Sequence, residues 1–178
     1  MAETTDPQVQ FLLDRLAVQD CVTRYARGLD RHDEEVLASA YHEDAIDHHG
    51  DFTGPIDEFV PWANAGHEAS YTAHTHYITN NRVEIDGDTA HSESYVLFVL
   101  KRGDGNGVDM GGGRYIDRLE RRNGEWRIAV RELLVEWSCQ AETGSHLGDT
   151  AVYPSGTWDR SDPSYRRPFE LTLPSGSR

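Results

Sequence analysis

Three residues of this chain have the types and the spacing for acid–base chemistry. His74 and His76 are two positions apart in a stretch rich in Thr, Tyr and Ile, so in a β-strand both rings point to the same face. Asp30 ends a stretch with helical periodicity and lies on its apolar side, where a carboxylate needs a partner or a proton. A carboxylate that accepts one ring N–H of His76 fixes the tautomer and makes the other nitrogen more basic. The pattern therefore predicts an Asp30–His76 dyad that acts as a general base.

Two other interpretations of these residues stay open. Asp30 could be a solvated residue of the loop that follows the helix, and His74 and His76 could bind a metal ion together with His48 or His49. Two histidines at this spacing are common, and no third ligand has diagnostic spacing, so we expect no metal site. Five further histidines are assigned ordinary surface or core roles: His32, His42, His67, His91 and His146.

Arg131 is the second unusual residue, because an arginine in the middle of an apolar strand pairs with a carboxylate or faces a ligand. The carboxylates available for pairing are Glu93 and Asp117, and Arg114 allows the same two interpretations. Strand alternation predicts one face formed by Arg127, Ala129, Arg131 and Leu133, and the opposite face by Ile128 and Val130.

The elements that must position these side chains follow from the change in hydrophobic period along the chain. Residues 9–29 have helical spacing, a short helix capped by Asp33 follows and turns Tyr41 inward, and Gly54-Pro55 starts a third helix that Pro61 would kink or split. Four strands are predicted over 71–85, 89–102, 113–121 and 125–137, with turns at Asp86-Gly87-Asp88 and Asn123-Gly124. Helices followed by an antiparallel meander predict an α+β fold, in which the helices and one curved sheet form a cone with a pocket inside.

Residues 140–178 form a predicted extension to a domain over residues 1–139. The extension carries large apolar side chains, so we expect it to be ordered on the domain or on a neighbouring subunit, with Trp158 as its anchor. Two roles are open for it: a lid that helps to close the pocket against water, and a strap that only joins subunits.

Composition disfavours several classes of function. The 178 residues include 31 acidic and 17 basic ones, for a formal net charge of −14, which argues against nucleic acid and anionic membrane surfaces as partners. The first ten residues lack the apolar core of a signal peptide and no apolar run could span a bilayer, so we expect a cytoplasmic protein. Two cysteines without a C-x-x-C pair and the lack of a nucleotide-binding glycine motif predict neither a disulfide framework nor a cofactor.

Several segments together resemble one protein family. The segment from Leu13 to Asp20, followed by Tyr25 and Gly28-Leu29-Asp30, resembles the first helix of SnoaL-like proteins, which belong to the nuclear transport factor two-like superfamily. Later segments similar to the same family are Tyr41-His42-Glu43-Asp44-Ala45, His74 to Asn80, Gly112 to Arg118 and Gly124 to Ile128. The resemblance covers about residues 10–140 and implies a cone-shaped barrel of one curved antiparallel sheet wrapped round N-terminal helices.

Within this family the pattern is similar to that of lindane dehydrochlorinase, bile-acid dehydratase and scytalone dehydratase. The resemblance implies His76 as the base, Asp30 as its partner, and Tyr25 or Arg131 as the group that assists the leaving group. We expect the substrate pocket to be lined by Tyr115, His49, Trp62 and Phe98. The implied function is a cofactor-independent lyase of the dehydratase type that acts on a small, largely apolar substrate, aromatic, steroid or polyketide-like. The general acid is left open.

Three alternatives share this scaffold. They are an isomerase or polyketide cyclase, a carbon–carbon lyase that releases formaldehyde from lignin-derived aromatics, and a non-catalytic small subunit like that of ring-hydroxylating dioxygenases. A deep pocket with Asp30 against His76 would favour an enzyme, and a filled cone would favour a structural subunit. The family further implies a homo-oligomer, with a trimer favoured over a dimer.

Overall fold

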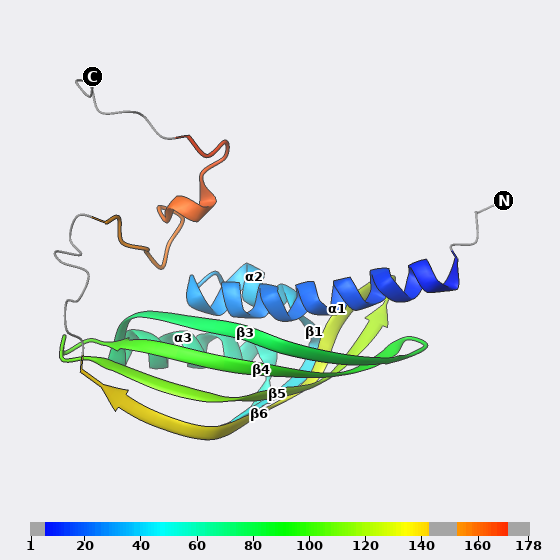
Figure 1. Cartoon of the computed structure of the whole chain (residues 1–178), viewed down its shortest axis with the longest axis horizontal. Coiled ribbons are helices and arrows are strands. Elements are labelled where there is room, and N and C mark those ends of the chain that lie inside the picture. Colours follow the sequence, from blue (N-terminus) through cyan, green and yellow to red (C-terminus); the bar gives the residue numbers. More distant parts are fainter. Residues whose placement is uncertain (1–5, 143–152, 171–178) are drawn as a thin grey trace.

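The computed structural model describes residues 6–142 and 153–170. Within these ranges the helices are α1 (Pro7–Asp30), α2 (Glu34–Ser39) and α3 (Ile56–Ser70), and a short 3₁₀ turn spans Pro163–Tyr165. The strands are β1 (Tyr41–His49), β2 (Phe52–Pro55), β3 (Tyr71–Asp86), β4 (Thr89–Arg102), β5 (Val108–Arg122) and β6 (Glu125–Ala141). The three helices lie on the concave side of one curved sheet (Figure 1), and this cone-like α+β arrangement is the predicted fold.

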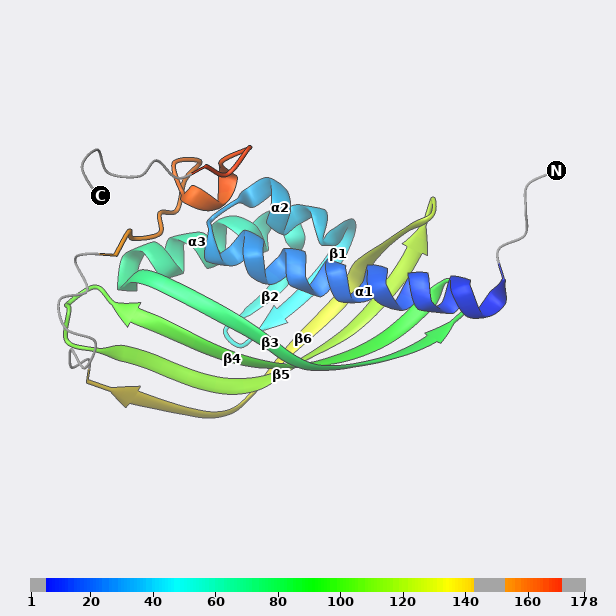
Figure 2. The ribbon, with the colours of Figure 1, turned by 45° about the horizontal axis from the view of Figure 1, so that its top comes forward.

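The sheet has the strand order β2-β1-β6-β5-β4-β3 and is open (Figure 2). The predicted antiparallel meander is confirmed for β3 to β6. The sequence reasoning missed β1 and β2, and β1 pairs with β6 in parallel, so the sheet is mixed rather than wholly antiparallel. Tyr41 was expected on the second helix, but α2 ends at Ser39 and Tyr41 begins β1, where its ring still points inward and is 1% exposed.

Helix α1 places Asp30, the proposed partner of His76, on the inside of the cone. Asp6 caps its first turn by accepting a hydrogen bond from Gln8 N, and Pro7 stands at the position where a missing N–H costs nothing. A glycine near the end of a helix usually weakens that end, but α1 continues past Gly28 to Asp30. Gly28 serves packing instead: a Cβ there would lie 2.4 Å from the backbone nitrogen of Leu37, so only glycine lets α2 approach this closely.

Helix α3 continues without a break through Pro61. Pro61 was expected to kink or split this helix, and the expected split is wrong. Pro61 lies on the exposed side of α3, while the opposite side buries Phe59, Val60 and Ala63 against the rest of the core. Packing of that apolar side outweighs the one helical hydrogen bond that a proline removes.

Strand β6 contains a bulge that changes which side chains enter the core. Leu119 of β5 pairs with Ile128, and the next pair joins Arg118 to Val130, so Ala129 is the extra residue. Ile128 and Arg131 are therefore both fully buried, whereas Val130 is exposed. The predicted alternation, which put Ile128 and Val130 on one face, is wrong for this reason.

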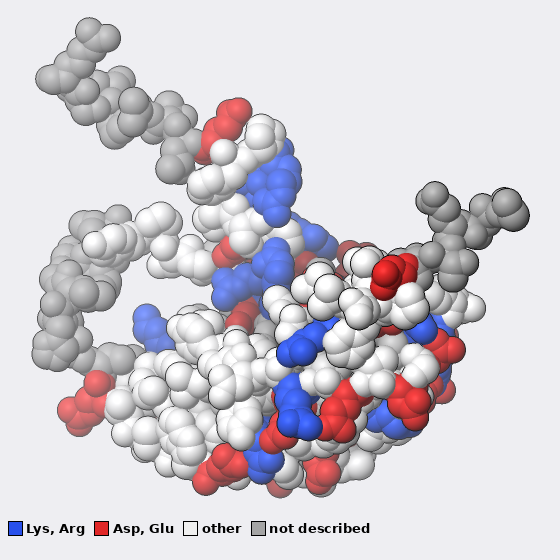
Figure 3. Space-filling view, turned by 45° about the vertical axis from the view of Figure 1, so that its right-hand side comes forward, with Lys and Arg blue, Asp and Glu red and all other residues white. Residues whose placement is uncertain are grey.

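The described part of the C-terminal segment lies against the ends of α1 and α2. Tyr165 Oη donates to Asp33 Oδ2 at 2.6 Å, and Arg31 forms an ion pair with Asp162 at 3.2 Å. Basic side chains gather along this segment and at its junction with the domain (Figure 3). Not all of its large apolar groups are buried as expected, because Tyr153 and Phe169 are exposed. Leu147, Val152 and Leu171, which belong to the same expectation, and His146 lie outside the described residues.

In the part of the chain that the structure describes, no helix is both long and apolar enough to cross a membrane.

Candidate active site

The end of α1 brings Asp30 against the first half of β3. His76 donates from its ring Nδ1 to Asp30 Oδ1 at 2.7 Å and from its backbone nitrogen to Asp30 Oδ2 at 2.9 Å. His74, two residues earlier on the same face, donates from Nδ1 to the same Oδ1 at 3.1 Å. Asp30 is 8% exposed and the His74 side chain is completely buried. Asp30 is thus a buried acceptor for both histidines and not a solvated loop residue.

These contacts decide the charge of Asp30 and the tautomer of His76. Burial by itself raises the pKa of Asp30, but the hydrogen bonds from His74 and His76 outweigh it and hold that pKa below its ordinary value. An ionised carboxylate can only accept, so His76 carries a proton on Nδ1 and presents the lone pair of Nε2. This is the arrangement of a carboxylate-oriented general base.

Arg131 occupies the centre of a second buried group. Its Nε and Nη2 each bind an oxygen of Asp117 at 2.7 Å, and both side chains are fully buried. Its guanidinium carbon lies 3.9 Å from the ring centre of Tyr25 and 4.2 Å from that of Tyr115. Of the two predicted interpretations, pairing with Asp117 is therefore confirmed. Arg114 pairs with Glu93 and Glu136 near the surface.

Two polar atoms of this group lack partners. Among the described residues, Arg131 Nη1 and Tyr25 Oη are buried and find no hydrogen-bond partner. Burial raises the pKa of Tyr25 well above its ordinary value, so its phenol keeps its proton and can donate. Burial opposes the charge of Arg131, but Asp117 and the surrounding tyrosines raise the pKa of its guanidinium, which stays protonated. Both atoms are therefore donors that a ligand could use, with the Tyr115 hydroxyl as the side chain that competes for Tyr25.

A third buried group links β1 to this interior. Tyr41 Oη donates to Asp47 Oδ2 at 2.5 Å, and His49 Nδ1 lies 3.1 Å from Asp47 Oδ1. Asp47 is fully buried, yet the sequence reasoning did not single it out. Asp47 reaches Tyr41 and His49 because all three lie on β1, a strand that the hydrophobic pattern did not reveal.

The residues expected to line a pocket lie in three places. His49, Phe59 and Trp62 pack around one another at ring-centre distances of 5.2 to 6.2 Å, and Trp62 is 42% exposed. Phe98 lies on β4 with its ring centre 6.2 Å from that of His76. Tyr115 lies deeper, beside Arg131, with its ring 5.3 Å from that of Tyr25. Burial is the largest cause of the raised pKa of Tyr115.

Aromatic rings occupy much of that interior in this structure. Tyr25, Tyr41, Phe59 and Tyr115 are each at most 1% exposed and contact one another. A surface hollow of about 530 Å³ is lined by Glu34, Ala38, Glu43, Ile56, Asp57, Val60 and Pro61, and one of about 400 Å³ by His42, Glu43, Asp44, Arg122, Asn123, Glu125 and Arg127. No predicted site residue lines either hollow, so neither hollow is the expected deep pocket.

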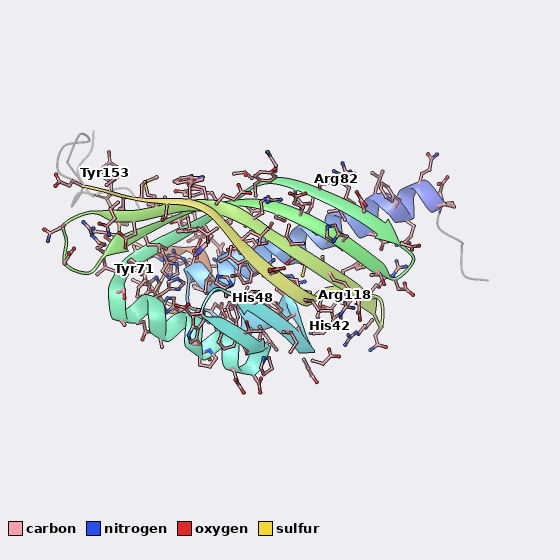
Figure 4. All side chains as sticks on the ribbon, turned by 90° about the horizontal axis from the view of Figure 1, so that it is seen from below. His42, His48, Tyr71, Arg82, Arg118 and Tyr153 are labelled. Carbon is pink, nitrogen blue, oxygen red and sulfur yellow. The ribbon has the colours of Figure 1, made fainter. Side chains whose placement is uncertain are left out.

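The histidines near His74 are not the ones that the sequence suggested. His48, labelled in Figure 4, lies on β1 with its side chain 48% exposed beside Glu132, and His49 is bound to Asp47. The rings that surround His74 belong to His32, which follows α1, and to His67 of α3. Both had been assigned ordinary roles, because no spacing rule connects three separate elements. Burial lowers the pKa of His67 to about 3, so its imidazole is neutral.

Trp158 covers this histidine group. Its indole stacks on the His32 ring at a centre distance of 4.1 Å and an interplanar angle of 7°, and it lies 5.2 Å from the His74 ring. The residue predicted to anchor the C-terminal segment therefore makes its contact beside the candidate site.

Comparisons with known proteins support the fold and show similarity to SnoaL-like proteins, dehydrochlorinases among them. A family model for a SnoaL-like domain matches residues 10–132. Hexachlorocyclohexane dehydrochlorinase 1 of Sphingobium indicum is 30% identical over 122 residues, which are 66% of this chain and 79% of that protein. The structure of a hexachlorocyclohexane dehydrochlorinase, LinA type 2, gives a TM-score of 0.72 at 25% identity and covers 80% of this chain and 98% of that one. A scytalone dehydratase-like structure from Novosphingobium aromaticivorans gives a TM-score of 0.68 at 19% identity, covers 77% of this chain and 93% of that one, and supports the fold alone.

Proposed function

Because the chain belongs to the SnoaL-like family, we propose that it is a lyase in which His76, oriented by Asp30, removes a proton from a carbon atom of the substrate. The observation that carries this proposal is the 2.7 Å hydrogen bond between His76 Nδ1 and the buried Asp30 carboxylate. Similarity to a dehydrochlorinase supports an elimination reaction.

In the proposed reaction the Nε2 lone pair of His76 takes the proton. The electron pair of the broken C–H bond forms a double bond to the neighbouring carbon, and the leaving group departs with the electron pair of its own bond. Asp30 stabilises the imidazolium that forms. The reaction as written consumes no oxidant, reductant or other co-reactant.

The second buried group would assist departure of the leaving group. Tyr25 Oη and Arg131 Nη1 are donors without a protein acceptor in the described residues, and a departing hydroxide or halide is an acceptor. Tyr25 would donate the hydrogen bond, while Asp117 and the tyrosine rings hold Arg131 in place. The aromatic surroundings, with Phe98, Trp62, His49 and Tyr115, suit a small and largely apolar substrate.

A non-catalytic subunit is the second candidate, because the rings of Tyr25, Tyr41, Phe59 and Tyr115 occupy much of the cone. Against it, a structural core has no need for two unpartnered donors or for a carboxylate that binds two histidines. A screen of halogenated, hydroxylated aromatic and steroid compounds, followed by product mass, separates the two candidates. Loss of water or of hydrogen halide supports the lyase, an unchanged mass with a new retention time supports an isomerase, and loss of formaldehyde a carbon–carbon lyase. No turnover of any compound, together with a tightly bound protein partner, would refute the proposal.

We further propose that the chain forms a homo-oligomer, with a trimer favoured. The strands expose large apolar side chains, among them Tyr77, Val135 and Trp137, which are 48 to 54% exposed. Exposed apolar side chains on one sheet suit a contact with a second copy. Light scattering at micromolar concentration measures the mass, and a monomer would contradict the proposal.

A further inference from the structure

We propose that His32, His67 and His74 form a binding site for a divalent transition metal ion, with Zn²⁺ as the probe ion. This inference goes beyond the proposed function, because none of the three rings is assigned to the reacting atoms, although His74 shares the Asp30 carboxylate with His76. One nitrogen from each residue can be chosen so that all three atoms lie within 4.8 Å of one another. Three imidazoles are a common zinc ligand set, in which a further position is open to water or another ligand.

The His32 and His74 rings are oriented so that one nitrogen of each lies close to the other. Their Nε2 atoms face each other at 3.0 Å. His74 Nδ1 donates to the ionised Asp30, so His74 Nε2 is a lone pair. His32 Nδ1 lies 3.4 Å from Glu68 Oε1 and has no hydrogen bond in the described part of the chain.

Neither tautomer of His32 satisfies both of its nitrogens. With the proton on Nε2, His32 donates to His74 but turns the lone pair of Nδ1 toward the Glu68 carboxylate. With the proton on Nδ1, the contact to Glu68 is favourable but two Nε2 lone pairs oppose each other at 3.0 Å. A cation between the two Nε2 atoms removes this conflict. Two nitrogens on one tetrahedral Zn²⁺, each bound at about 2.0–2.1 Å, stand roughly 3.3 Å apart, which is close to the spacing already present.

The position of His67 favours a metal ion over a proton shared by His32 and His74. His67 packs its ring against His74 at a centre distance of 4.1 Å, and its buried Nδ1 finds no partner among the described residues. A proton shared by His32 and His74 would leave that nitrogen unsatisfied, whereas a metal ion accepts a third imidazole. Carboxylates behind two of the rings, Asp30 on His74 and Glu68 near His32, provide the outer contacts that orient metal-binding histidines.

The site would join three elements beneath the C-terminal segment. His32 follows α1, His67 belongs to α3 and His74 to β3, and the Trp158 indole stacks on His32. A bound ion would therefore cross-link the open end of the cone and hold the surface on which Trp158 rests.

Calorimetric titration of the full chain with Zn²⁺, after treatment with a chelator, tests the site. We expect saturable binding of one ion per chain, and a higher thermal midpoint in its presence. The variants His67→Phe and His32→Phe keep an aromatic ring but remove a ligand nitrogen, and a phenyl ring at position 32 can still stack on Trp158. Each should weaken binding by at least about 100-fold, the upper end for outer-shell changes, since it removes a direct ligand. His48→Asn, a half-exposed histidine of β1, is the matched control and should bind as the wild type does.

Two spectroscopic readouts are separate from catalysis. Co²⁺ should give the visible bands of a four- or five-coordinate site, and Cu²⁺ should quench the fluorescence of Trp158, so that quenching is smaller in Trp158→Phe. Circular dichroism and thermal unfolding show whether each variant is folded; His67 Nδ1 has no partner to lose among the described residues, so His67→Phe is expected to fold. Absence of saturable Zn²⁺ binding to the wild type, or unchanged affinity in folded His67→Phe, would overturn the proposal.

Discussion

Replacing Asp30 by asparagine tests the proposed dyad with the smallest change of shape. Three donors converge on the carboxylate: the His76 backbone N–H at 2.9 Å, His76 Nδ1 at 2.7 Å and His74 Nδ1 at 3.1 Å. An amide has one acceptor oxygen and places two N–H donors where the second oxygen was. At least one histidine must then turn or change its tautomer, and His76 no longer presents a basic Nε2 in a fixed direction.

The expected loss follows from what a positioned general base contributes. Such a group accelerates a reaction by about 10²–10⁴-fold, so Asp30→Asn and His76→Ala should each lower kcat/KM by at least about 100-fold, which is about 3 kcal/mol. The two side chains act as one unit through the 2.7 Å bond, so the double variant should be little slower than either single variant.

The assay is the rate of product formation by mass spectrometry on a substrate found in the screen, with thermal unfolding as a check that each variant is folded. His48→Asn should keep wild-type activity, because this half-exposed side chain contacts Glu132 and not the dyad. Asp30→Asn with wild-type activity would refute the reasoning. Losses that multiply in the double variant would show that the two residues act independently, and the dyad would be wrong.

Three other predictions concern other parts of the chain. Arg131→Met should lower the free energy of unfolding in urea by about 3–5 kcal/mol, because it leaves the buried Asp117 carboxyl, whose pKa burial already raises, without its partner. The double variant Arg131→Met with Asp117→Leu should regain much of this, and a single variant as stable as the wild type would contradict the buried pair. Iodoacetamide at pH 8 should modify the exposed Cys139 and not the buried Cys21. Burial raises the pKa of the Cys21 thiol to about 11, so at pH 8 this thiol stays protonated. Modified Cys21 in mass spectra of the native protein treated in this way would refute the prediction. Trp158→Ala, and truncation after Thr143, should lower turnover with the oligomer intact if the C-terminal segment is a lid. Loss of the oligomer in light scattering would instead identify a strap, and no change in either property would exclude both roles.

Local chemistry explains why much of the fold could be predicted. Asp33 was expected to cap a helix and accepts a hydrogen bond from Val36 N, and Asn123-Gly124 was expected to turn and has φ values of 53° and 83°. Helical periodicity before residue 70 and β-rich strands after it led to the α+β order. These features depend on residues within a few positions of one another, which is why the sequence alone reveals them.

The proximity of Asp30 to His76 could also be anticipated, because each residue lies at a definite place on a strongly patterned element. Asp30 is on the buried side of α1, and His76 is on the face of β3 that α1 covers.

The tertiary structure decided the rest, and in each case a contact between distant elements was responsible. The bulge at Ala129 depends on the pairing of β6 with β5, and it turned Arg131 toward Asp117 and the tyrosine rings. Strand β1 has no strong period of its own and forms because β6 offers an edge parallel to it. His32, His67 and His74 belong to three separate elements, so no spacing in the sequence relates them. The sequence determined the types of elements and the face that each one buries, whereas the partners of the buried polar groups depended on how the elements pack.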